Sequence, residues 1–124
     1  MTQGQAVQVR RFPERLDAKL ERRFLDEVSS AMSAERPRLV FDCTAVRRMD
    51  SPAIHCLLCC LEEAMKRNGD VRLAAVPAEA EAMLELTGAY SLFQTFDTVE
   101  EAAASFHARE QSMAPQPAPG PILS

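Results

Sequence analysis

The chain of 124 residues is 47% hydrophobic and 26% charged, values that are typical of one soluble globular domain with its own core. Its 14 lysines and arginines are outnumbered by 18 aspartates and glutamates, so the formal net charge is −4. This balance argues against a general nucleic-acid-binding protein, because binding to phosphates needs clustered positive charge.

The first half of the chain contains a predicted strand, a helix and a second strand. Apolar and polar residues alternate over residues 7–9, which predicts a short strand that ends before Pro13. Apolar side chains recur every four residues over 16–32, as they do on the buried face of an amphipathic helix. Residues 38–43 form an apolar run that predicts a buried strand, and the polar loop 44–50 follows it.

Ser51 and Pro52 form a typical helix start, with the serine as N-cap and the proline as the first helical residue. This helix is expected to run to Arg67, where Asn68 and Gly69 end it. The remaining predicted elements are a strand over 70–76, a helix over 77–87, a connector and strand over 92–96, and a last helix that opens with the capping box 98–101.

Strands and helices therefore alternate along the chain, as they do in βαβ units. We expect an α/β fold, with a mostly parallel sheet of four to five strands and about four helices packed against it. Prolines at 115, 117, 119 and 121 and few large apolar residues predict a disordered tail over 109–124. The folded part is expected to be a single domain over residues 1–108.

An ordered set of segments resembles the STAS family, which contains the anti-sigma factor antagonists and their relatives. The segments are Leu39–Val46, Met49–Ser51, Ile54–Leu61, Asn68-Gly69, Val71–Val76, Leu84–Gly88, Leu92-Phe93, Phe96-Asp97 and Val99–Ala104. The resemblance covers about residues 7–108. It implies a STAS-like fold and a regulatory, protein-binding module that is not an enzyme and needs no cofactor.

In such antagonists, the serine after the aspartate at this helix start is phosphorylated by a partner with both kinase and anti-sigma activity. The resemblance therefore implies phosphorylation of Ser51, which follows Asp50, and release of the partner. Phosphoserine adds about −1.5 to −2 charges, which a helix N-terminus tolerates, so we expect binding to change while the fold is kept. Arg47 and Arg48 lie close enough in the sequence to pair with the phosphate.

Two residues depart from the family pattern, which usually has a serine and a glycine after the modified serine. Here Pro52 removes one backbone N–H, and Ala53 adds a methyl group where a kinase approaches. Residue chemistry alone favours a simpler role for Ser51, as an N-cap that contributes about 1 kcal/mol.

The helix that begins at Ser51 is expected to have one sheet-facing stripe and one cysteine-lined face. The stripe comprises Ile54, Leu57, Leu58, Leu61 and Met65; the other face comprises Cys56, Cys59, Cys60 and Glu63, with His55 and Lys66 at its margin. We expect the cysteine-lined face to dock a partner, with burial under another layer as the alternative. The expected partner-binding residues are Arg47, Arg48, Asp50, Ser51, Pro52, Ala53, His55, Cys56 and Cys59.

A thiol-dependent or metal-dependent redox protein is an alternative from another class. However, one helix rarely supplies four tetrahedral ligands and His107 is remote, so we expect no metal. The spacing of Cys56 and Cys59 lacks the sequence context of a thioredoxin-type motif.

The expected partner is a protein: a kinase-type anti-sigma factor or, alternatively, a transporter or signalling assembly such as a lipid-transport ATPase that holds an unphosphorylated STAS subunit. In the family that the chain resembles, another strand usually precedes the one expected over residues 7–9. We expect that strand to be missing here, which would leave a sheet edge for a partner or for a second copy in a homodimer. Residues 1–11 contain no apolar leader, and the uncharged stretch 51–61 is too short to span a bilayer. We therefore expect a cytoplasmic protein with free thiols and no membrane insertion.

Overall fold

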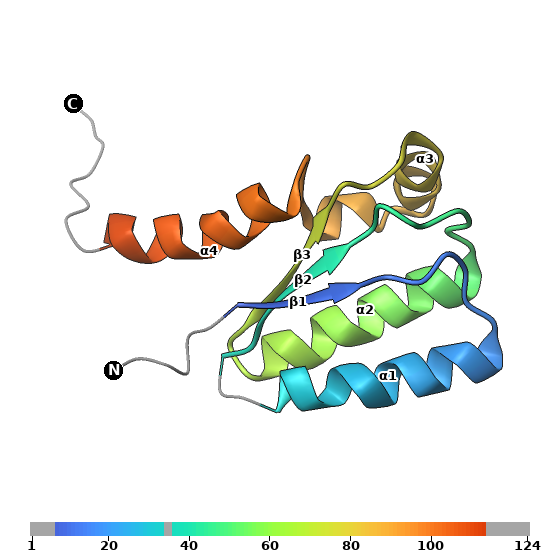
Figure 1. Ribbon diagram of the computed structural model, residues 1–124, viewed down its shortest axis with the longest axis horizontal. Coiled ribbons are helices and arrows are strands. Elements are labelled where there is room, and N and C mark those ends of the chain that lie inside the picture. Colours follow the sequence, from blue (N-terminus) through green and yellow to red (C-terminus); the bar gives the residue numbers. More distant parts are fainter. Residues whose placement is uncertain (1–6, 34–35, 114–124) are drawn as a thin grey trace.

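Four parallel strands form the centre of the molecule, in the order β1-β2-β3-β4. Figure 1 labels the first three of them. The computed structural model describes residues 7–33 and 36–113. The predicted α/β fold, with a parallel sheet and four helices, is confirmed. The elements are β1 (Gln8–Arg11), α1 (Ala18–Met32), β2 (Arg38–Asp42), α2 (Ser51–Lys66), β3 (Asp70–Ala74), α3 (Ala78–Thr87), the 3₁₀ turn η2 (Tyr90–Leu92), β4 (Gln94–Phe96) and α4 (Val99–Met113).

Helices cover both faces of the sheet, and the two faces carry cores of unequal size. In Figure 1, α1 and α2 run side by side along one face, whereas α4 crosses the other. Alternation along β2 points Leu39 and Phe41 into the large core beneath α1 and α2, and Val40 into the small core beneath α4. Ala102 and Phe106 of α4 close that small core.

The end of α2 is set by a tight connection to β3, as the Asn68-Gly69 pair predicts. The helix ends at Lys66, and Asn68 has a left-handed backbone with φ of 64°. Gly69 is required for a different reason, because its backbone lies against Pro37: a Cβ at Gly69 would be 2.0 Å from the Pro37 carbonyl oxygen. Its N–H donates to the carbonyl of Ala64 at 2.8 Å.

Several boundaries of helices and strands differ from the sequence-based expectation. Asp50, not Ser51, is the N-cap of α2, and Ser51 is its first helical residue, so the predicted capping role of Ser51 is wrong. The first helix begins later than expected, because Asp17 caps it by accepting from the Leu20 N–H at 2.8 Å. The strand after Gly69 ends at Ala74, because Ala75 has a φ of 57°.

The last helix, α4, overlaps the first residues of the expected Pro-rich tail. Its N-terminus is capped as predicted, since the Glu101 N–H donates to the Thr98 hydroxyl at 3.1 Å. The helix continues to Met113, so residues 109–113 are helical. The rest of the expected tail, residues 114–124, lies outside the described residues, and the domain bounds remain a prediction.

Candidate functional site

The loop between β2 and α2 places Ser51 at the carboxyl end of the sheet. Buried Val46 and Met49 anchor this loop in the large core. At its start, an Asp42 carboxylate oxygen accepts hydrogen bonds from the Thr44 hydroxyl and from the Thr44 N–H, the latter at 3.0 Å. The Thr44 hydroxyl and then its N–H hold the pKa of Asp42 below its ordinary value, although partial burial acts in the opposite direction. Asp42 therefore organises the loop as a hydrogen-bond acceptor.

The same loop is also tied to the segment that follows β1. The Glu14 carbonyl accepts from the backbone N–H groups of Arg47 and Arg48, at 2.8 and 3.1 Å. Both arginine side chains are exposed. The guanidinium groups of Arg47 and Arg48 therefore lie on the surface, shortly before the start of α2.

At the helix start itself, Ser51 is exposed. The Asp50 carbonyl accepts from the Ile54 N–H at 2.9 Å, but the Asp50 side chain makes no capping bond. Its Oδ1 is buried and has no hydrogen-bond partner among the described residues. Pro52 follows Ser51 and supplies no N–H, so this helix N-terminus offers fewer donors than usual to an anion.

The cysteine-lined face is not the exposed docking surface that the sequence predicts. Cys56 is fully buried, Cys60 is 3% exposed and Ala53 is fully buried, whereas Met65 from the expected sheet-facing stripe is 61% exposed. The reason is that α2 packs against α1 as well as against the sheet. Ala53 and Cys56 therefore cannot offer their side chains to a partner. The lack of charge in the first two turns of α2 was a signal of burial on two sides.

Three residues of α2 that lie four apart form a line that we call the α2 ridge: Ser51 and His55, which are exposed, and Cys59, which is half-buried. Residues at this spacing lie on one helix face. The His55 side chain is 68% exposed, and its Nδ1 lies 2.7 Å from Oε2 of Glu21 on α1. Its Nε2 lies 3.6 Å from the Cys59 sulfur, which is half-buried. Glu21 could not be predicted as a neighbour of His55, because it is remote along the chain and meets His55 only through helix packing.

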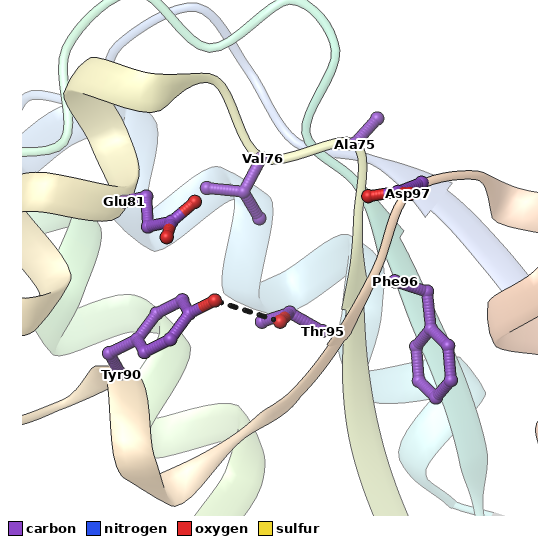
Figure 2. A pocket seen from close by; sticks show the side chains of 7 residues that line it. All are labelled: Ala75, Val76, Glu81, Tyr90, Thr95, Phe96 and Asp97. Carbon is purple, nitrogen blue, oxygen red and sulfur yellow. Dashed lines mark hydrogen bonds between the residues drawn. The ribbon is translucent and has the colours of Figure 1, made fainter.

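A second feature at the carboxyl end of the sheet was also missed. A cavity of about 280 Å³ opens beyond the ends of β3 and β4 (Figure 2). It is lined by Ala75, Val76, Glu81, Tyr90, Thr95, Phe96 and Asp97. These residues come from α3, η2, β4 and the segments that follow β3 and β4, so no local motif marks them.

The environments of the thiols differ from those of reactive cysteines. Burial raises the pKa of Cys43 to about 12. A hydrogen bond with Cys60, together with burial, raises the pKa of Cys56, and burial raises that of Cys59. Redox-active cysteines instead have a lowered pKa, because the thiolate is the nucleophile. Within residues 7–33 and 36–113, no group of three or more histidine, cysteine, aspartate or glutamate side chains is placed to hold a metal ion.

These environments predict selective labelling of the native protein. A thiol reagent at neutral pH is expected to modify Cys59 first, and to reach Cys43 and Cys56 only after unfolding, because those two side chains are buried and protonated. Mass spectrometry of the labelled protein identifies the sites, and a Cys59→Ser variant is the control. Rapid labelling of Cys43 or Cys56 in folded protein would contradict this packing of α2.

None of the described helices combines the length and apolar character that a bilayer-spanning helix needs.

Comparisons with known proteins agree with this architecture. The family model described as "STAS domain" matches residues 2–102. One similar solved structure is an anti-sigma-factor antagonist (STAS) domain protein from Planctomyces limnophilus, with a TM-score of 0.70 and 20% identity over 78% of this chain and 87% of that chain. No curated protein matches the sequence significantly.

Two transport-related structures are equally similar in fold. A sulfate transporter family protein from Wolinella succinogenes has a TM-score of 0.73 and 17% identity, over 88% of this chain and 89% of that chain. The SulP transporter STAS domain from Vibrio cholerae has a TM-score of 0.68 and 15% identity, over 86% and 84%. At these identities the likenesses establish the fold alone.

Proposed function

Because the chain belongs to the STAS domain family, we propose that it is a non-catalytic regulatory module that binds a protein partner beside the start of α2. Phosphorylation of Ser51 releases that partner. The observation that carries this proposal is the exposed Ser51 at the first position of α2, at the end of the ridge with His55 and Cys59.

Electrostatics support a switch of binding in which the fold is kept. A phosphate on Ser51 lies at the positive end of the α2 dipole and within reach of the arginine-bearing loop before it. Arg47 and Arg48 are exposed there, so their guanidinium groups are available to pair with the phosphate. At a partner interface, by contrast, the same charge must be desolvated, which weakens binding.

The partner that we propose is a cytoplasmic serine kinase with anti-sigma activity, in line with the solved STAS protein described as an anti-sigma-factor antagonist. A second candidate function is a constitutive STAS subunit of a transporter or signalling assembly. Pro52 favours this second candidate, because it removes one N–H from the place where a phosphate would sit. Among the described strands, β1 pairs only with β2, so its other edge is where a second copy would add in a homodimer.

Substitution of Ser51 separates the two candidates. Ser51→Ala is expected to hold the co-purifying partner, whereas Ser51→Asp is expected to lose at least about tenfold in affinity, which corresponds to about 1.4 kcal/mol. The measurement is a quantitative pull-down, with phosphate-affinity electrophoresis of protein taken from cells. Ser30→Asp is the matched control, because Ser30 is exposed near the end of α1, which leads to the opposite edge of the sheet.

The melting temperatures of all three variants should stay close to that of the unsubstituted protein. Equal capture by Ser51→Ala and Ser51→Asp, with no phosphorylated form in cells, would contradict the switch and leave the constitutive subunit.

A further inference from the structure

The cavity beyond β3 and β4 presents negative and hydroxyl groups to solvent. Glu81 reaches into it from the first turn of α3, and Tyr90 reaches in from η2 (Figure 2). Thr95 faces them from β4, and its hydroxyl oxygen lies 3.2 Å from that of Tyr90. Asp97 stands at the rim, where it is exposed. The Ala75 N–H donates to the Phe96 carbonyl at 2.9 Å, which joins the segment after β3 to β4 beside the cavity.

The negatively charged lining of the cavity favours a positively charged occupant. No basic side chain lines it, and in the part of the chain that the structure describes neither Glu81 nor Asp97 forms an ion pair. Phosphates, nucleotides and carboxylates would meet two negative groups with no compensating cation. A cation, by contrast, is attracted electrostatically to both carboxylates.

The hydroxyl pair adds directional contacts. Tyr90 and Thr95 share one hydrogen bond, so one hydroxyl proton and several acceptor lone pairs remain for an occupant. A guanidinium group suits this lining best, because its five N–H donors lie in one plane and can reach carboxylate and hydroxyl oxygens together. A volume of about 280 Å³ lies just below the roughly 300–1,000 Å³ of small-molecule sites, so the occupant is about as large as one long side chain.

The position of the cavity connects it with the proposed partner surface. All four strands are parallel, so the loop after β2 that leads to Ser51 and the segments after β3 and β4 emerge at the same edge of the sheet. The end of β2 is joined to the end of β3 by the hydrogen bond from the Cys43 N–H to the Ala74 carbonyl, at 2.9 Å. A protein that covers Ser51 is therefore close to the cavity.

We propose that this cavity is an anchor site for an arginine side chain of the protein partner that docks beside Ser51, an inference that rests on the proposed function. The guanidinium group enters between Glu81 and Asp97 and donates to the Tyr90 and Thr95 oxygens. The cavity thereby gives the interface a charge-selective contact that is separate from the phosphorylated residue.

The test uses the isolated chain and three small probes, followed through its backbone amide signals by nuclear magnetic resonance. The probes are arginine blocked at both ends as N-acetyl and N-methylamide, the neutral analogue citrulline blocked in the same way, and free arginine. Blocked arginine is expected to bind with a millimolar Kd and to shift the amides of Ala75, Val76, Thr95 and Asp97. Blocked citrulline is expected to bind at least about tenfold more weakly.

A pair of substitutions that removes both carboxylates of the cavity supplies the site control. The double variant Glu81→Gln with Asp97→Asn should lose about tenfold or more in affinity for blocked arginine. The matched double variant Glu79→Gln with Glu100→Gln should bind it unchanged, because it removes the same charge at exposed positions that do not line the cavity.

Three results would overturn the proposal: no shift of the cavity amides at saturating probe, equal affinity for arginine and citrulline, or free arginine bound much more tightly than the blocked form. The last result would assign the cavity to a free amino acid. These titrations need neither the partner nor a modified Ser51, so their failure leaves the phosphorylation switch standing. Equal capture by the Ser51 variants, in turn, leaves the titrations unaffected.

Discussion

Gly69→Ala is expected to destabilise the fold by roughly 3 kcal/mol or more, a larger loss than most single substitutions cause. The added Cβ would lie 2.0 Å from the carbonyl oxygen of Pro37 and 2.6 Å from its nitrogen. Both contacts are with backbone, which cannot turn away as a flexible side chain can. Relief would require the start of β2 to move from β3, where the Asp70 N–H donates to the same Pro37 carbonyl at 2.9 Å.

Urea unfolding of the two proteins measures this loss, and Gly88→Ala is the control. Gly88 ends α3 with a φ of 83°, but a Cβ there meets nothing within 4 Å. Its substitution is therefore expected to cost only the left-handed backbone penalty, about 1–2 kcal/mol. Similar losses at the two glycines would show that the Pro37 contact relaxes easily.

Arg72→Ala is expected to lose about 3 kcal/mol of stability, because Arg72 is a charged residue that is only 2% exposed. Its Nε donates to Oδ2 of Asp70 at 3.1 Å, and its Nη1 donates to the Ser105 hydroxyl. The guanidinium carbon lies 4.0 Å from the centre of the Phe106 ring. Removal leaves a void beneath α4 and takes from Asp70 its cationic partner.

Arg72→Met separates the two contributions, since it keeps most of the buried volume and removes the charge. About half of the loss is expected for this variant, measured by urea unfolding. Hydrogen exchange of the α4 amides provides a local readout, because Ser105 and Phe106 both belong to α4. If Arg72→Met is as stable as the unsubstituted protein, the charge network does not hold α4 on the sheet.

The sequence predicted the elements well where their signals are local. The apolar residues that recur every four positions in α1, and the apolar run of β2, are the residues that face the core. The predicted and observed elements therefore agree there. The Asn68-Gly69 end of α2 was likewise predicted. The sequence could not show that Gly69 is needed because its backbone lies against Pro37. That contact is between the segment before β2 and the segment before β3, which are far apart in the sequence.

The site was predicted less completely, for a physical reason. Exposure of Ser51 depends on the local helix start, whereas exposure of the cysteines depends on what packs over α2. Helical periodicity gives the faces of a helix but not the number of layers that cover them. The burial of Cys56 and the contact between Glu21 and His55 were therefore not predicted, because both follow from the packing of α1 on α2.

Strand order in this sheet equals chain order, which has a consequence for how the protein is made. Each strand pairs with the one synthesised just before it, so a growing chain on the ribosome can extend the sheet step by step at its newest edge. None of the four described strands has to insert between two earlier ones. Only the face of the sheet that α4 covers is completed last, because the guanidinium group of Arg72 stays uncovered until the residues of α4 have been translated.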